Sequence, residues 1–397
     1  MKKDRFYYAG QGRIHELLLA DLELQLIGKT FPRFELRGLY WDALIEEEYK
    51  PNLLKYSTYF KDTFKWELRQ ESRGLMMSDN YGPHLIYPFK GKMIPDTASV
   101  LLGINIFHLI PAFRDKVTVL DPFCGSGTIL VEAMLKGNEN ISKIIGNEIV
   151  PFYADISKAK IKALLGEEIV SLSPDTLKEY TPNWKDPKPE DIIYALYRYS
   201  KNNKNWPKNA SKRMTLVKEL MDVMFHTIDK WNIEICTNVE VKVGSATNLD
   251  IPDESVDVIV TSPPYSLALN YQRENPIPPD YPKKWDPTLQ VESGDLDKYR
   301  LLMLMAYCEM NRVLTDDGFV AIVIGDQNVK GQRIPNVEWT KDKMQSLGFE
   351  LYYEIEELVF GARNISKDTI LIFEKVSEVP SETIEFIREW KNSLLGD

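Results

Sequence analysis

The stretch VDVIVTSPPY, residues 256–265, begins with a β-branched apolar run and continues into two consecutive prolines and a tyrosine. Such runs are typical of buried parallel strands, and proline cannot continue a ladder, so we expect a strand over 256–260 that stops there. Open α/β sheets bind ligands at the carboxyl ends of their strands. The candidate site residues here are Ser262, Pro263, Pro264 and Tyr265. Taken alone, the pattern also fits a strand that ends in a Pro-Pro turn.

These residue types suit chemistry on the amino group of a nucleobase. The lone pair of that amine is delocalised into the ring, which makes the nitrogen a poor nucleophile. Two fixed acceptors, the Ser262 hydroxyl and the Pro263 carbonyl, would favour a tetrahedral nitrogen with a free lone pair. The Tyr265 ring would hold an extruded base by stacking.

A second motif, DPFCGSGT, occupies residues 121–128, after the short β-branched run 117–120 and before a helical run that begins at Ile129. Strand, glycine-rich turn and helix make up the nucleotide-binding unit of doubly wound folds. Gly125 and Gly127 would let the backbone approach a ligand, and the lack of a following Gly-Lys-Ser/Thr argues against a triphosphate site. Glu148, at the end of the next strand, is placed to bind ribose hydroxyls, as in dinucleotide folds.

The alternation of strands and helices predicts an α/β fold with additions. It resumes at 239–249, where Ser245 and Ala246 follow a strand, and it closes with a strand pair over 351–360 and 369–374. The proline-containing loop after Tyr265 has the profile of a mobile functional loop. We divide the chain into an N-terminal extension (1–80), a cofactor-binding half (81–165), an insertion (166–236), a catalytic half (237–376) and a C-terminal helix (377–397).

Composition limits the class of protein. The 397 residues are 44% hydrophobic and 27% charged, no apolar run reaches the length of a membrane span, and the three cysteines fit no zinc spacing. We therefore expect a cytoplasmic protein without a membrane partner or a metal. The net charge of −10 argues against a uniformly basic surface, but residues 180–213 carry eight Lys/Arg and three acids among aromatics. This region is a candidate for nucleic-acid recognition, although a solvated helical face gives the same count.

Together, the two motifs resemble those of the S-adenosylmethionine-dependent DNA amino-methyltransferases, the cytosine-N4/adenine-N6 family, and especially its cytosine-N4 branch. The resemblance covers roughly residues 84–376 outside the insertion. The stretches that carry it are 121–128 and 261–265, with support from Tyr87-Pro88-Phe89-Lys90, Met93-Ile94-Pro95, Gly325-Asp326 and Arg333-Ile334-Pro335.

The resemblance implies a Rossmann-like methyltransferase sheet with helices on both faces, S-adenosylmethionine as methyl donor and DNA as partner. It places the glycine loop around the methionine part of the cofactor, Glu148 at the ribose, and Ser245 and Ala246 beside the adenine. The loop residues concerned are Asp121, Pro122, Phe123, Gly125, Gly127 and Thr128. Ser262, Pro263, Pro264 and Tyr265 would hold the target base, and Cys124 is interpreted as a packing residue rather than a nucleophile.

Three substrates are compatible with these motifs. Ser262 favours cytosine N4, because the guanine-N2 methyltransferases of tRNA and rRNA, which the 121–133 stretch also resembles, usually have Asp or Asn at that position. Those RNA enzymes and the DNA adenine-N6 methyltransferases are the alternatives. Many relatives carry an acid where Ser245 stands, and many cytosine-N4 enzymes have the two motifs in the opposite order.

Overall fold

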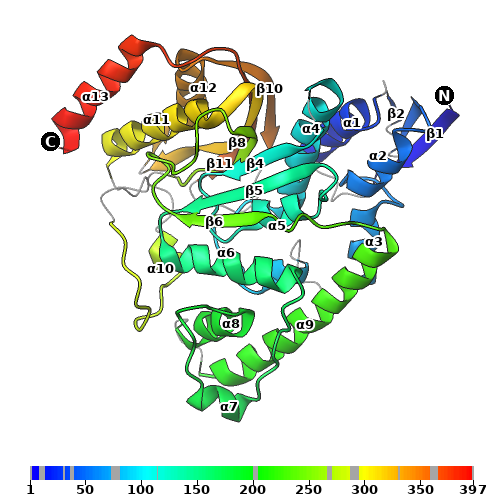
Figure 1. Cartoon of the computed structure of the whole chain (residues 1–397), viewed down its shortest axis with the longest axis vertical. Helices are drawn as coiled ribbons and strands as arrows, with labels where there is room; N and C mark the ends of the chain where they lie inside the picture. The colour runs from blue at the N-terminus through cyan, green and yellow to red at the C-terminus, as the bar shows by residue number, and fades with distance from the viewer. Residues whose placement is uncertain are drawn as a thin grey trace.

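The computed structural model describes residues 2–8, 14–29, 32–35, 40–72, 81–113, 115–199, 204–265, 271–286, 295–329, 331–357 and 365–395. Within these ranges one large sheet forms the centre of the molecule (Figure 1). Its strands are β4 (Val117–Asp121), β5 (Ile141–Glu148), β6 (Val239–Val243), β7 (Val256–Thr261), β8 (Leu314–Val329), β9 (Gln332–Ile334), β10 (Phe349–Glu357) and β11 (Ile365–Lys375).

The strand order is β10-β11-β8-β7-β4-β5-β6, with β9 paired to the end of β8. Neighbours from β6 to β8 are parallel, whereas β11 runs antiparallel between β8 and β10. The order reverses between β4 and β7, and such a switch point opens a crevice at the carboxyl ends of the strands. The predicted Rossmann-like sheet and its closing antiparallel pair are confirmed.

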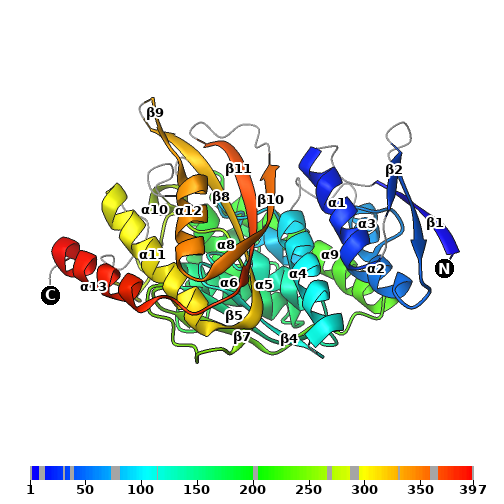
Figure 2. The ribbon, with the colours of Figure 1, turned by 90° about the horizontal axis from the view of Figure 1, so that it is seen from above.

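Helices cover both faces of the sheet because successive strand residues point to opposite sides. Val119 and Val258 join one buried cluster, while Leu120 and Ile259 join the other. The first face carries α4 (Pro95–Phe113), α5 (Thr128–Met134) and α6 (Pro151–Leu164), and the second carries α11 (Leu296–Val313), α12 (Asn336–Ser346) and α13 (Ser381–Leu395). Figure 2 shows α11, α12 and α13 on one side of the sheet and α4 on the other.

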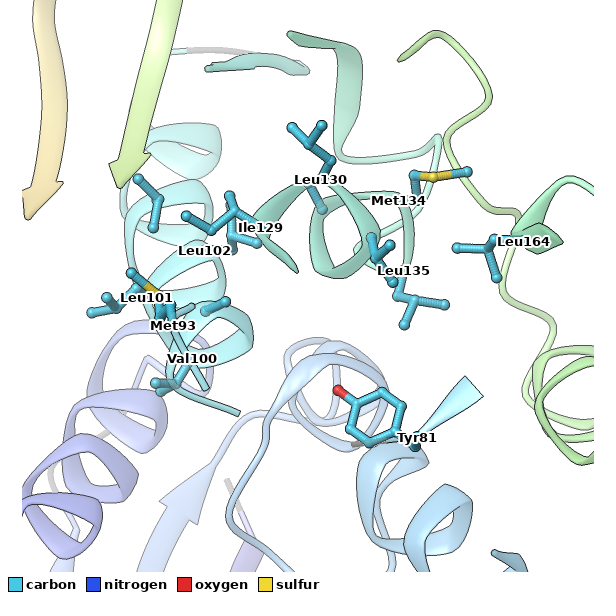
Figure 3. Packing of buried hydrophobic residues seen from close by; sticks show 14 of the residues in the cluster. Tyr81, Met93, Val100, Leu101, Leu102, Ile129, Leu130, Met134, Leu135 and Leu164 are labelled. Carbon is cyan, nitrogen blue, oxygen red and sulfur yellow. The ribbon is translucent and has the colours of Figure 1, made fainter. Parts of the chain in front are cut away.

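The N-terminal extension forms a small sheet and helices that share their core with the rest of the chain. The elements are β1 (Lys2–Tyr7), α1 (Ile14–Leu26), β2 (Arg33–Glu35), β3 (Tyr40–Ile45), α2 (Lys50–Tyr56), α3 (Phe64–Glu71) and the 3₁₀ turn η1 (Gly82–Leu85). The strand order is β1-β3-β2. Trp41 and Phe64 belong to the same buried cluster as Leu102 and Leu130, and Figure 3 shows leucines of α4 and α5 inside that cluster. The extension is therefore continuous with the main core.

The insertion contains α7 (Pro174–Glu179), α8 (Pro189–Arg198) and the long α9 (Trp206–Lys230), which packs against α3, α7, α8 and η1. The sequence predicted a helix only from residue 216, so α9 begins about three turns earlier. Several interleaved aromatics of 180–213 are packing residues: Trp184 and Tyr194 are each 7% exposed. The neighbouring Lys204, Lys208 and Lys212 are exposed.

The loop that follows the Pro-Pro motif is held down over its described part, 271–286, which includes α10 (Tyr271–Glu274). Asn275, only 1% exposed, accepts from the Lys90 backbone amide at 2.9 Å and donates to the Lys90 carbonyl at 3.1 Å. The Tyr281 hydroxyl donates to Asp155 at 2.6 Å. Hydrogen bonds thus connect Asn275 to the segment before α4 and Tyr281 to α6; the mobility of the loop stays a prediction.

No helix in the described ranges is both long and apolar enough to cross a bilayer.

Candidate active site

A cleft lies at the carboxyl ends of β4 and β7, where the sheet order reverses. The two strand ends are joined by a hydrogen bond from the Thr261 hydroxyl to Asp121 at 2.8 Å. The cleft has an empty volume of about 830 Å³, which includes the solvent at its open side. Its lining includes Phe89, Gly91, Lys92, Met93, Asp121, Pro122, Phe123, Cys124, Gly125, Ser126, Thr128, Ile129, Glu148, Ile149, Val150, Tyr153, Gly244, Ser245, Ala246, Ser262 and Pro264.

Asp121 is the buried acid of this cleft. It is 2% exposed, and its Oδ1 accepts from the Thr261 hydroxyl and from the Phe123 amide at 3.1 Å. Burial is the main reason why the pKa of this carboxyl is raised to about 7, and the nearby negative charge of Glu148 contributes to the increase. The hydrogen bonds from Thr261 and Phe123 act in the opposite direction and lower the pKa. Asp121 therefore changes charge near neutral pH.

Glu148 holds the glycine loop from the end of β5. Its two carboxylate oxygens accept from the Gly125 amide at 3.0 Å and from the Val150 amide at 2.8 Å. Asn147 adds a second link, because its side-chain amide donates to the carbonyls of Pro122 and Gly244. Sequence reasoning did not identify Asn147, although it directly precedes the predicted ribose-binding acid.

The two glycines of the loop have different surroundings. Both have positive φ, +50° for Gly125 and +75° for Gly127. A Cβ on Gly125 would meet nothing closer than the Phe123 carbonyl at 3.9 Å, so this position opens into the cleft. A Cβ on Gly127 would lie 2.9 Å from Ser157 on α6. Gly127 does not line the cleft, so its predicted contact with a ligand is replaced by close packing between the loop and α6.

This difference predicts separable effects of two alanine substitutions. Gly127→Ala should lower the free energy of unfolding by about 3 kcal/mol, because it combines a left-handed backbone with a clash. Gly125→Ala should cost only about 1 kcal/mol and should weaken cofactor binding instead. Urea unfolding and calorimetric titration would measure both effects. Equal losses of stability in the two variants would contradict the assignment.

The segment after β7 alternates between the cleft and the core. Ser262 and Pro264 line the cleft, whereas Pro263 is buried and Tyr265 is 5% exposed within the second buried cluster. The Tyr265 hydroxyl donates to Asp368 on β11 at 2.8 Å. An extended chain turns neighbouring side chains to opposite sides, so only every second residue faces the cleft. The expected open stacking face of Tyr265 is therefore not present in this arrangement.

Ser245 and Ala246 lie where the sequence placed them, on the turn after β6 and in the wall of the same cleft. Ser245 is tied to Thr247 through their hydroxyl oxygens at 2.9 Å. Cys124 also lines the cleft, and burial raises the pKa of its thiol well above the usual range. A protonated thiol is a weak nucleophile, which agrees with its interpretation as a packing residue.

The predicted site residues do not cover the whole lining of the cleft, and the polar residues missed include Lys92, Ser126 and Tyr153. Lys92 lies in the segment before α4, which the sequence analysis used only as support for the resemblance. Ser126 was inside the quoted glycine motif, where only the glycines and the flanking residues received a role. Tyr153 gives no local signal, because its position depends on the packing of α6.

The comparisons with known proteins agree with this geometry. Residues 107–181, which include the glycine loop and Glu148, match the family described as the RMKL-like methyltransferase domain. The chain carries a methyltransferase domain. This domain implies S-adenosylmethionine as its cofactor.

Curated relatives cover parts of the chain. The Type II methyltransferase M.MjaVI of Methanocaldococcus jannaschii is 33% identical over 99 residues, which is 21% of this chain and 51% of the relative. M.SfiI of Streptomyces fimbriatus is 29% identical over 122 residues, 29% of this chain and 26% of the relative. The matches thus span about half of one relative and about a quarter of the other.

Among solved structures, the rRNA methyltransferase aviRa of Streptomyces viridochromogenes aligns with a TM-score of 0.37 and 11% identity. The alignment covers 77% of this chain and 92% of aviRa. A similarity at this level supports no inference about the substrate.

The methyltransferase cleft fits the chemical groups of S-adenosylmethionine. Thr128 Oγ1 is buried and has no hydrogen-bond partner among the described residues, so a donor is available for a ligand oxygen. Gly125 leaves room for close approach to the loop. Asp121 offers negative charge for the cationic end of the methionine part, and Glu148 stands at the second strand end, where a ribose diol would lie. When bound, the cofactor supplies an electrophilic methyl group on a sulfonium.

The pKa of Asp121 predicts a pH dependence of cofactor affinity. Below pH 7 the carboxyl is protonated and loses its attraction for the ammonium and the sulfonium, so affinity should fall as the pH falls. Between pH 8 and pH 6 we expect a loss of up to about 10-fold. Calorimetric titration at several pH values would measure it. Asp121→Asn should bind weakly at every pH, and an unchanged slope in this variant would assign the effect to another group.

Proposed function

We propose that this chain transfers the methyl group of S-adenosylmethionine to the exocyclic N4 of a flipped-out cytosine in DNA. The observation that carries the proposal is the position of Ser262. Together with Pro264 it lines the same cleft as the glycine loop and Asp121, so the hydroxyl that would hold an amine shares one cavity with the groups that would hold the cofactor. Alignment of amine, methyl carbon and sulfur is the main requirement of such a transfer.

The choice of DNA rests on the curated relatives, which are Type II methyltransferases. The choice of cytosine N4 rests on Ser262, since an acid or amide is more usual at this position in adenine- and guanine-directed enzymes. The choice of DNA and the choice of cytosine N4 are both proposals, because the relatives match only parts of this chain.

The residues of the cleft have distinct roles in this reaction. The Ser262 hydroxyl and the Pro263 carbonyl would accept hydrogen bonds from the amine and so localise its lone pair. Fixed acceptors of this kind need no reorganisation during the reaction. The amine proton leaves to water after transfer, and no covalent intermediate is needed, in accord with the protonated Cys124 thiol. Tyr265 would act indirectly, through its bond to Asp368, by fixing the segment that carries Ser262.

The insertion remains the candidate surface for the DNA backbone. Its buried aromatics stabilise the helices, and the exposed Lys204, Lys208 and Lys212 supply positive charge on an otherwise acidic chain. Contacts of this type position a duplex without reading its sequence.

Nucleoside mass spectrometry of DNA and RNA from a host that expresses the protein tests the proposal. We expect N4-methylcytosine in DNA, and none in a parallel host that expresses the Asp121→Asn, Ser262→Ala double variant. N6-methyladenine in DNA would overturn the base assignment. Methylated guanine confined to tRNA or rRNA would overturn the choice of DNA.

A further inference from the structure

A second cleft lies beside α11 and α13. Its walls come from these two helices, from the segment that joins β11 to α13, and from Thr247 in the turn after β6. The empty volume is about 770 Å³, which includes the solvent at its open side. This α11–α13 cleft shares no lining residue with the methyltransferase cleft, so it is a separate cavity that the methyl-transfer reaction does not explain.

Apolar side chains form much of the wall of the α11–α13 cleft. Met305 of α11, Val379, and Ile384 and Ile387 of α13 line it. Ile384 is 45% exposed, so part of this apolar wall is open to solvent, while Ile387 is buried. Sites for small molecules combine such apolar walls with a few polar groups that fix the orientation of the ligand. The polar groups of this cleft therefore indicate what kind of molecule it can hold.

The charged side chains of the α11–α13 cleft already have partners within the protein. All five N–H groups of Arg312 donate, two of them to Glu309 and the others to acceptors in the segment 249–253. Both carboxylate oxygens of Glu309 accept in these bonds, and Glu378 pairs with Lys375 at 2.6 Å. A charged ligand would thus meet no unpaired counter-ion among these three lining residues, and the cleft favours a neutral molecule.

Asn311, which is fully buried on α11 and lines the cleft, has an unused hydrogen-bond acceptor. Its Nδ2 donates to the carbonyls of Leu347 and Ser377 at 2.7 and 2.9 Å, which uses both amide hydrogens and leaves Oδ1 as the other end. Oδ1 is buried and accepts from no donor in the described part of the chain. A buried acceptor without a partner is costly, and an N–H or O–H group of a ligand would remove that cost.

Cys308 adds a polar but uncharged group to the same wall. Burial, with a contribution from the negative charge of Glu309, raises the pKa of its thiol to about 12. The sulfur therefore stays protonated at neutral pH and offers no charge to an ionic ligand. This agrees with the neutral character of the rest of the cleft.

We propose that the α11–α13 cleft binds a neutral small molecule that combines an apolar body with an N–H or O–H group, and that this group donates to Asn311 Oδ1. The binding does not depend on which base the protein methylates. The site adjoins the methyltransferase cleft, because the Thr247 hydroxyl in its wall lies 2.9 Å from the hydroxyl of Ser245 in the other wall. The turn after β6 thus contributes to both cavities.

Indole and benzofuran test this assignment, because they have nearly the same shape and only indole carries an N–H donor. Ligand-observed NMR titrations would use the 397-residue chain with and without saturating S-adenosylhomocysteine in the methyltransferase cleft. We expect indole to bind with similar affinity in both titrations. Benzofuran should bind about 10-fold more weakly, since it leaves Asn311 Oδ1 unpaired.

Two tryptophan variants locate the binding. Met305→Trp adds bulk inside the α11–α13 cleft and should weaken indole by about 10-fold or more. Leu394→Trp is the matched control on α13, because Leu394 is 38% exposed and does not line the cleft; it should leave the affinity for indole unchanged. Both variants should keep the wild-type affinity for S-adenosylhomocysteine, which reports on the intact fold.

Several outcomes would overturn the proposal. No binding of indole by the wild-type chain would show that the cleft does not take this class of molecule. Equal affinity for indole and benzofuran would exclude Asn311 as the acceptor. Displacement of indole by S-adenosylhomocysteine, or indole binding that survives Met305→Trp, would place indole in another site. If Met305→Trp does not fold, Cys308→Phe fills the same cavity, with the same loss expected and the same contrary result.

Discussion

Replacing Glu132 with alanine is expected to lower the free energy of unfolding by about 3–5 kcal/mol, since it leaves a buried cation without its partner. Glu132 lies on α5 with 0% exposure. Its carboxylate pairs with Lys65 of α3 and accepts from the Tyr81 hydroxyl at 2.5 Å and from His84 Nε2 at 2.9 Å. Figure 3 shows Tyr81 near α5, in the buried cluster around this network.

The protonation states of the network give this prediction a pH dependence. Burial raises the pKa of Glu132, but Lys65 and the His84 hydrogen bond outweigh it and lower the pKa to about 2. The stabilisation from Glu132 is therefore present above its unfolded pKa and is lost as pH falls toward 2. The buried, neutral His84 acts in the same direction: its pKa of about 3 lies below the usual 6.5, so unfolding takes up a proton and stability falls as pH drops below 6.5.

Urea unfolding at pH 7.5, pH 5 and pH 3 would measure both effects. Asp250→Ala is the control, because the Asp250 side chain is 97% exposed and pairs with Lys242 at the surface; it should change stability far less than Glu132→Ala does. In a Lys65→Met, Glu132→Met double variant, which removes both charges, the loss should be smaller than in Glu132→Ala. A Glu132→Ala protein as stable as the control variant would contradict the assigned role.

The Lys65–Glu132 pair joins the N-terminal extension to the main domain, and this connection could not be recognised in the sequence. Lys65 and Glu132 are far apart in the chain, and neither lies in a recognisable motif. Only folding brings α3 against α5, and the pairing fixes residues of the extension to the helix that follows the glycine loop. Charge pairs between distant segments leave no periodic pattern in a sequence. The boundary at residue 80 was therefore placed where the recognisable motifs begin, although the buried cluster contains residues from both sides of it.

The central fold, by contrast, was predictable in most of its parts. The strands around Val119, Val258 and Val320 are buried on both faces and therefore read as continuous β-branched runs, bounded by glycine or proline. Helices beginning at Pro95 and Pro151 carry the proline expected at a first helical position. The early start of α9 was missed because Trp206 and Pro207 follow a polar stretch that resembles a loop.

At the site, the motifs located the cleft but not the direction of each side chain. Gly127 and the Tyr265 ring were assigned to ligands, yet Gly127 packs on Ser157 and Tyr265 turns into the protein. A motif identifies a segment, whereas the side that faces the cleft depends on strand register and on neighbours such as Asp368.

Ser262→Ala should lower the single-turnover rate of methyl transfer by about 100-fold while leaving the Kd for S-adenosylmethionine within about 2-fold, because its hydroxyl would act on the amine in the transition state and not on the cofactor. Tyr265→Phe is the matched control: it keeps the buried ring, removes the hydroxyl that donates to Asp368, and should reduce the rate far less. Rapid-quench assays with labelled cofactor would give the rates, and calorimetry the affinities. A parallel loss of rate and cofactor affinity in Ser262→Ala would show that Ser262 shapes the cofactor pocket, and the acceptor for the amine would then have to be sought in another residue of the cleft.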